Sequence, residues 1–116
     1  TAVSALEPAQ VQRDLIAFAA VSAGARPAVD PSHPLVEGVR VRNPKTGREA
    51  VVLMNWAYRG RDLVVINELK VVIPNAGSLR GARSVAQRRN LEVVRDGATL
   101  VVDVGEMQEG DVLLLE

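Results

Sequence analysis

The chain has 116 residues, of which 47% are hydrophobic, so it fits one folded domain with a core of its own. Its 14 Lys and Arg residues balance its 14 Asp and Glu residues, and we therefore expect neither nucleic acid nor a membrane as a partner. The absence of cysteine excludes a disulfide scaffold and thiolate chemistry.

The composition favours strands over helices. Twenty valines and only three aromatic residues indicate an aliphatic, β-branched core. No apolar run approaches the roughly 20 residues of a membrane span, and no signal-peptide pattern opens the chain. We therefore expect a soluble, mainly β domain, in a compartment that the sequence does not identify as cytoplasmic or secreted.

The first part of the chain is predicted to contain one α-helix, at residues 8–23. Val11, Leu15 and Phe18 recur there at helical spacing and form one apolar stripe. Such a stripe needs a partner surface. The helix either packs on the sheet of this domain or is the last helix of a preceding domain, and the sequence favours neither.

Proline-rich sequence follows the helix. Residues 24–34 carry three prolines and are predicted to be an extended connector. We therefore divide the chain into residues 1–33, a helix with its connector, and residues 34–116, the β domain.

The run Val51–Trp56 is predicted to be the central strand of the domain, buried on both faces, because it is almost entirely apolar. The segment Val36–Arg42 precedes it and alternates, which predicts a strand with Arg40 and Arg42 on an outward face. A four-residue loop, Pro44–Gly47, would join the two strands and place Arg42 opposite Glu49.

The middle of the chain carries two further predicted strands. Leu63–Ile73 reads as one strand with a break near Asn67-Glu68, and it ends at a proline. Leu79–Ala86 reads as a weaker strand, and turn residues separate the two.

A hairpin signal follows. Leu91–Val94 and Thr99–Val104 flank Asp96-Gly97, a pair that favours a type I′ turn and would place Val93 opposite Leu100. After an acidic loop, Val112–Leu115 is a last apolar strand that we expect to lie centrally or to be covered on both faces. Together these segments predict an antiparallel β-sandwich of about seven strands with one N-terminal α-helix.

Candidates for catalysis and metal binding are few. His33 is the only histidine, and a surface position in the connector is the more economical interpretation of it than a catalytic role. Glu106, Glu109 and Asp111 cluster in one loop, but they lack the spacing of a known calcium loop. No glycine-rich phosphate loop occurs. We predict no catalytic residue, no metal site and no cofactor.

The aromatic residues give one candidate binding site. Trp56 and Tyr58 could stack on a sugar ring while Asn55 donates a hydrogen bond, although a tryptophan that fills the core is the simpler interpretation. Asn55 should also face away from Trp56, because side chains alternate along a strand.

From residue 33 onward, the order of segments resembles the small C-terminal β-sandwich domain of multidomain glycoside hydrolases. In those β-galactosidase-like enzymes the domain follows a barrel and a trimerisation-type α/β domain. The helix end, Ser22–Pro27, is similar to the final helix of that α/β domain. The segments that carry the resemblance are Pro34–Glu37, Val52–Trp56, Leu69–Pro74, Ser84-Val85, Leu91 with Asp96-Gly97, and Asp111–Leu115.

The resemblance implies a noncatalytic accessory domain, because the catalytic carboxylates of those enzymes lie in the barrel. Its expected partner is a neighbouring domain or subunit of a larger enzyme, with carbohydrate as a further candidate ligand. The alternatives are a carbohydrate-binding module that uses Trp56 and Tyr58, and a small enzyme built around His33.

Overall fold

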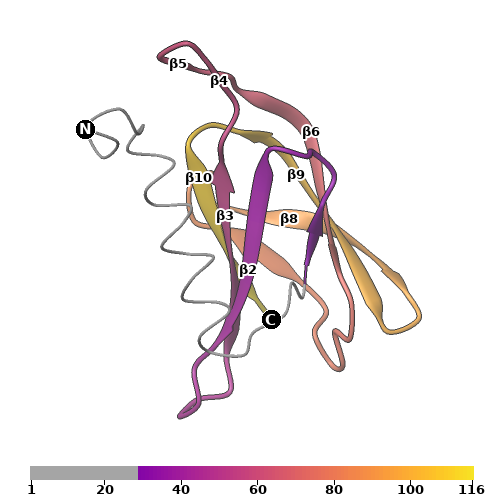
Figure 1. Ribbon diagram of the computed structural model, residues 1–116. Coiled ribbons are helices and arrows are strands. Elements are labelled where there is room, and N and C mark those ends of the chain that lie inside the picture. Colours follow the sequence, from indigo (N-terminus) through magenta and orange to yellow (C-terminus); the bar gives the residue numbers. More distant parts are fainter. Residues whose placement is uncertain (1–28) are drawn as a thin grey trace.

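The computed structural model describes residues 29–116, and Figure 1 shows that part of the chain in colour. The predicted helix at residues 8–23 lies outside the described residues. The boundary between residues 33 and 34 stays a prediction. Among residues 29–116 there is no helix long and apolar enough to cross a membrane. The described chain consists of strands and the turns that join them.

Eight strands form one antiparallel sheet, in the order β1-β6-β9-β8-β7-β10-β3-β2, and two short strands, β4 and β5, form a separate hairpin. The prediction of a mainly β, antiparallel fold is therefore confirmed. The bounds are β1 Asp30–Pro31, β2 Val36–Arg42, β3 Glu49–Asn55, β4 Tyr58–Arg59, β5 Asp62–Leu63, β6 Ile66–Ile73, β7 Ala82–Ser84, β8 Arg89–Asp96, β9 Thr99–Met107 and β10 Gly110–Leu115.

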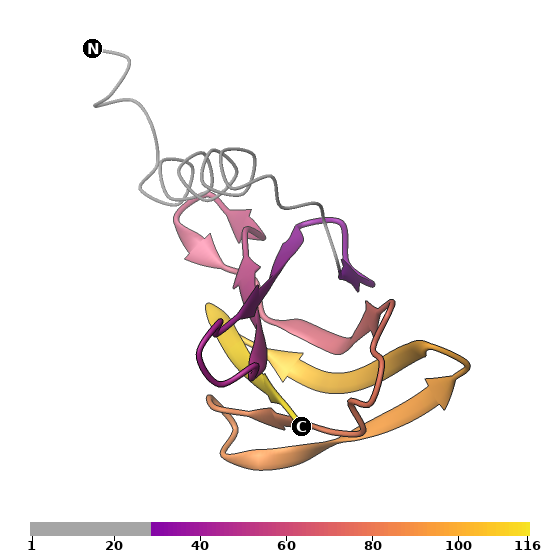
Figure 2. The ribbon, with the colours of Figure 1, turned by 90° about the horizontal axis from the view of Figure 1, so that it is seen from below.

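The sheet curls on itself and is nearly closed, rather than being divided into the two separate layers of the predicted sandwich. Strand β8 joins its two halves, because residues 89–91 pair with β7 while residues 92–96 pair with β9. At the open seam, β1 lies against β2. Figure 2 shows the curl, with β8 and β9 on the side away from β2 and β3.

The inside of the curled sheet is an aliphatic core, as the composition predicts. Its largest fully buried side chains include Leu53, Leu69, Ile73, Leu100 and Leu113. They come from β3, β6, β9 and β10, so both halves of the sheet contribute to one core. Burial of apolar area of this kind is the main favourable term in folding.

The hairpin of β2 and β3 has the predicted register, with Arg42 paired with Glu49 and Val39 with Val52. The predicted outward face of β2 is wrong, because Arg40 pairs with Val51, which is fully buried. Arg40 lies on this inner side because its guanidinium has partners there: it binds the Glu49 carboxylate at 2.9 Å.

Strand β3 is also less central than predicted. It lies between β2, which is an edge strand, and β10. Its inward side chains Val51, Leu53 and Asn55 are buried, whereas Val52 and Met54 on the other face are half-buried. Burial on both faces is therefore wrong for this strand, because no second strand layer covers its outer face among the described residues.

The hairpin of β8 and β9 forms, but its register is shifted by two residues. Val93 pairs with Val102 instead of Leu100, and Asp96 pairs with Thr99, so the loop is Gly97-Ala98. Gly97 has φ of 60°, whereas Asp96 is not among the residues with positive φ. A glycine with positive φ at the first loop position is typical of a type II′ turn, which needs no second positive φ.

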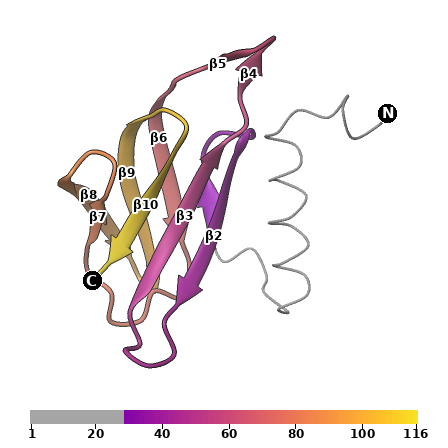
Figure 3. The same cartoon turned by 90° about the vertical axis from the view of Figure 1, so that its left-hand side faces the viewer.

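Two details of the later strands match the sequence. The predicted break in the third strand is a bulge in β6, where Glu68 has φ of 55° and the pairing with β9 shifts. Strand β10 is paired on both sides, by β7 and β3, as expected of a central apolar strand. Figure 3 shows β10 beside β3, with β2 on the other side of β3.

Candidate functional site

Asn55, one of the three predicted binding residues, lies at the end of β3 and is only 3% exposed. Its side-chain amide donates hydrogen bonds of 2.8 Å to the Val64 and Gln108 carbonyl oxygens. Its carbonyl oxygen accepts the Ala57 backbone N–H at 2.8 Å. Both amide N–H groups are therefore engaged within the protein, and none is left for a sugar hydroxyl.

Trp56 follows Asn55 and is half-buried. Its backbone N–H donates to the Leu35 carbonyl oxygen at 2.8 Å, which fixes the chain beside the start of β2. The indole Nε1 is buried without a hydrogen-bond acceptor among the described residues. A buried indole N–H normally has an acceptor, so this side chain is an exception among the buried polar side chains of residues 29–116.

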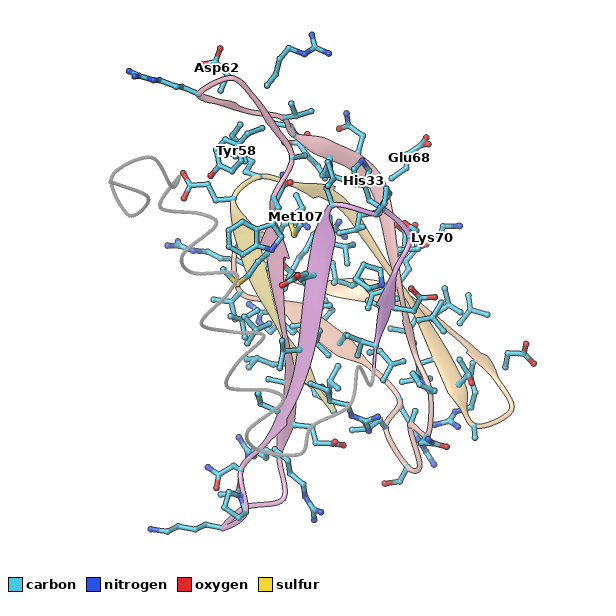
Figure 4. All side chains as sticks on the ribbon, in the orientation of Figure 1. His33, Tyr58, Asp62, Glu68, Lys70 and Met107 are labelled. Atoms are coloured by element: carbon cyan, nitrogen blue, oxygen red, sulfur yellow. The ribbon has the colours of Figure 1, made fainter. Side chains whose placement is uncertain are left out.

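Tyr58 is the most exposed of the three, at 47% of its surface. It lies in β4 and pairs with Leu63 of β5. In Figure 4, Tyr58 is at the upper end of the molecule, near the β4–β5 hairpin. The structure thus places the three predicted residues near one end of the sheet, but it separates a buried amide from an exposed phenol.

Other exposed apolar residues lie in segments that backbone hydrogen bonds hold next to residues 56 and 57. The Val64 backbone N–H donates to the Ala57 carbonyl oxygen at 2.7 Å, which holds the segment after β5 beside the end of β3. We call four of these exposed residues the end patch: Leu35, Tyr58, Val64 and Val65. The end patch is the most apolar exposed part of the candidate site.

His33 and Ser32 lie in the turn before β2. The His33 Nδ1 accepts the Leu35 backbone N–H at 3.1 Å, and the Ser32 hydroxyl oxygen accepts the Lys70 backbone N–H at 3.0 Å. Each side chain therefore supports the local backbone. A base and a nucleophile in a catalytic pair would instead bond to each other.

A shallow cavity of about 560 Å³ opens beside the loop from β9 to β10. Its lining includes Glu106, Glu109 and Asp111, the acidic cluster of the sequence, together with Gln87. No group of three or more His, Cys, Asp or Glu side chains among residues 29–116 is arranged to hold a metal ion. The cluster is thus a cavity wall without a metal-ligand arrangement.

The polar side chains at the base of this cavity bond to each other and to the backbone. The buried Asp111 carboxylate accepts the Ser84 hydroxyl and the Ala86 and Val112 backbone N–H groups, the last two at 2.9 and 2.7 Å. The Gln87 side-chain Nε2 donates hydrogen bonds to the Val104 and Glu106 carbonyl oxygens, at 2.8 and 3.2 Å. These hydrogen bonds hold the turn after β7 against β9 and β10. They leave few free hydrogen-bonding groups for a ligand.

Sequence reasoning missed the roles of Ser84, Gln87 and Asp111. Ser84 and Asp111 are 27 residues apart, so no local motif connects them. One signal was present: Ser84 and Asp111 are polar residues beside apolar strand residues. Polar side chains that are buried in a strand are normally hydrogen-bonded, so a structural partner could have been expected for each.

Comparison with known proteins finds a similar solved structure but no matching sequence or family. No protein-family model matches the chain, and no curated protein sequence matches it. Among solved structures, the chain is similar to part of α-L-fucosidase isoenzyme 2 from Paenibacillus thiaminolyticus, with a TM-score of 0.62 and 12% sequence identity. The match covers 77% of this chain and 15% of the fucosidase.

The likeness shows a shared fold. At this identity it does not extend to activity. The fucosidase contains a section with the same fold as this chain, and that section is a small fraction of its length.

Proposed function

We propose that this chain is a noncatalytic accessory β-domain of a carbohydrate-active enzyme of the glycoside hydrolase type, and that it packs against a neighbouring domain or subunit. The observation that carries the proposal is the fold likeness to a section of an α-L-fucosidase. An accessory role fits the small covered share, because the fucosidase is several times longer than the matched part.

The chemistry of the candidate site supports the same proposal. Catalysis needs polar groups that converge on a substrate with free hydrogen-bonding capacity. Here the polar side chains of Asn55, Asp111 and Gln87 bond to the protein backbone. Side chains arranged in this way stabilise the fold and leave little for turnover.

The end patch is the surface that we assign to the neighbouring domain of the same enzyme. Exposed apolar side chains in a cluster are typical of a surface that another domain covers. Tyr58 adds an aromatic group of the kind that is enriched at such contacts. Contacts between domains of one chain are commonly of moderate size, so a patch of a few residues can be decisive.

The test uses the natural gene product that contains this chain. Leu35→Glu combined with Val65→Glu should lower the temperature at which its glycosidase activity is lost by several degrees, since charges would then face the neighbouring domain. Val94→Glu is the matched control, because Val94 is 66% exposed on β8. Equal effects of the two variants, or a gene product without glycosidase activity, would contradict the proposal.

A carbohydrate-binding module is the second candidate, and the exposure of Tyr58 beside a half-buried Trp56 favours it. The single tryptophan makes the test simple. If a sugar stacks at this end, titration with oligosaccharides will change the Trp56 fluorescence, and Tyr58→Ala will weaken that change. An unchanged spectrum across a panel of sugars would reject this candidate.

A further inference from the structure

The outer side of the β2–β3–β10 region is mostly apolar, although it faces away from the core. Glu37, which pairs with Met54, is the charged residue on this side. In β3 and β10 the residues on this side alternate with buried ones, whereas in β2 only Val36 is buried. We call six apolar residues on this side the outer face: Val39, Val41, Val52, Met54, Val112 and Leu114. Pairing places Val39 beside Val52 and Val52 beside Val112, so the outer face is continuous across the three strands.

The outer face differs from the outer side of the other half of the sheet. There, Glu92 pairs with Asp103, and Asp103 also pairs with Lys70. That half is mixed, because Val101 on the same side pairs with Val72 and with Val94. An antiparallel sheet whose outer side meets water normally carries polar residues, and the outer face carries fewer of them than that half does. An aliphatic outer side indicates a surface that is covered in the folded protein.

The described residues leave the outer face incompletely covered. Val41 and Leu114 are exposed, whereas Val39, Val52, Met54 and Val112 are half-buried. The outer face belongs to β2, β3 and β10, whereas the residues of the end patch lie outside these three strands. It therefore needs a partner of its own.

The dimensions of the outer face suit one helix. Strands of seven residues, such as β2 and β3, are about 23 Å long. Three adjacent strands span about 10 Å between their outer axes, close to the diameter of a helix with its side chains. A 16-residue helix, the length predicted for residues 8–23, would be about 24 Å long.

The described chain begins next to β2, on the inner side of the sheet, where Val29 is buried in the core. Val29 lies beside β2, since a Cβ added to Gly38 would lie 2.5 Å from the Val29 Cγ2 atom. The six residue steps from Ala23 to Val29 reach about 20 Å when extended. Strand β2 is at the edge of the sheet, so the chain needs to pass only one strand to reach the outer face.

From these observations we infer that residues 8–23 of this chain dock as an amphipathic helix on the outer face. The stripe of Val11, Leu15 and Phe18 supplies the matching apolar side. Docking a helix on one face of an antiparallel sheet is a common way to cover that face. The inference concerns this chain alone, and it stands whether or not the chain is part of a glycoside hydrolase.

The test uses the absence of cysteine from the chain. Val52→Cys is combined in turn with Val11→Cys, Leu15→Cys and Phe18→Cys, and the full chains are oxidised at low concentration. A disulfide forms readily where two Cα atoms approach within about 7 Å. We expect an intramolecular disulfide with at least one stripe position, detected by mass spectrometry and by mobility on a non-reducing gel.

Two pairs serve as controls. Arg13→Cys with Val52→Cys uses the opposite side of the predicted helix, and Phe18→Cys with Val94→Cys uses a strand outside the outer face. Cross-linking at the best stripe position should exceed both controls, because only Cα atoms within bridging distance form the disulfide without backbone movement. Cross-linking no greater than the controls, or disulfides mainly between two copies of the chain, would overturn the inference.

Discussion

The Asn55 side chain shows how one residue can hold segments that do not pair in the sheet. It contacts the chain after β5, the loop between β9 and β10, and its own following turn. Asn55→Ala would leave these buried backbone groups without partners. We expect the free energy of unfolding to fall by about 3 kcal/mol, measured by urea denaturation.

Asn90→Ala provides the matched control, because Asn90 is exposed on β8. It should change stability by less than about 0.5 kcal/mol. Equal losses for the two variants would show that the Asn55 contacts contribute little.

At this scale the sequence located Asn55 but not its role. Its two acceptors, Val64 and Gln108, lie 9 and 53 residues away, and only the folded chain brings them together. An asparagine next to an aromatic residue looks the same in a sequence whether it binds a sugar or a backbone. The stacking role of Trp56 and Tyr58 stays a prediction.

Among the elements, the β8–β9 hairpin depends on the turn at Gly97-Ala98. Gly97 has φ of 60°, a conformation that costs other residues about 1 kcal/mol, so Gly97→Ala should destabilise the protein by that amount. Gly81 lacks a positive φ and has no atom within 4 Å of an added Cβ. Gly81→Ala should therefore be neutral or stabilising by up to about 0.5 kcal/mol.

Thermal unfolding of the two glycine variants measures this difference. Equal destabilisation by both would contradict the assigned turn. An opposite order, with Gly81→Ala the weaker protein, would do so more strongly.

The two hairpins show which registers a sequence can predict. In β2–β3, the loop length and the Arg42–Glu49 pair both select the observed register. In β8–β9, a shift of two residues keeps every side chain on its original face, so the apolar pattern fits both registers equally well. Only the turn conformation distinguishes them, and Asp96-Gly97 is a favourable sequence for a different turn type.

Over the whole molecule, Arg40 links distant parts of the curled sheet. It binds both carboxylate oxygens of Glu49, and its Nη1 donates to the Pro74 carbonyl oxygen at 2.8 Å. The contact thus joins the β2–β3 hairpin to the end of β6. The sequence predicts that Arg40 faces outward, as charged strand residues commonly do. That prediction fails because the Pro74 carbonyl that binds Arg40 is 34 residues away, and no local pattern reveals it.

Arg40→Lys should weaken this link, because an ammonium group cannot reproduce the planar fork that binds Glu49 and the turn together. We expect a loss of about 1 to 2 kcal/mol in the free energy of unfolding, measured with urea. Arg42→Lys is the control, since Arg42 is exposed. A loss that is no larger for Arg40→Lys than for Arg42→Lys would contradict the assigned link.

The nearly closed sheet itself could not be read from the sequence. The strand pattern predicts antiparallel strands, but it gives about seven of them where the described residues form ten. It also does not show that β8 pairs with β7 along one half and with β9 along the other. A two-residue strand such as β1 is also invisible in a proline-rich segment. Closure depends on these pairings, which only the complete chain establishes.

The most direct measurement is a hydrolysis assay of the purified chain with a panel of aryl glycosides that includes an α-L-fucoside. The account predicts a rate equal to that of buffer for every substrate, even at high protein concentration. Hydrolysis above that background which copurifies with the chain and is lost in His33→Ala would contradict it.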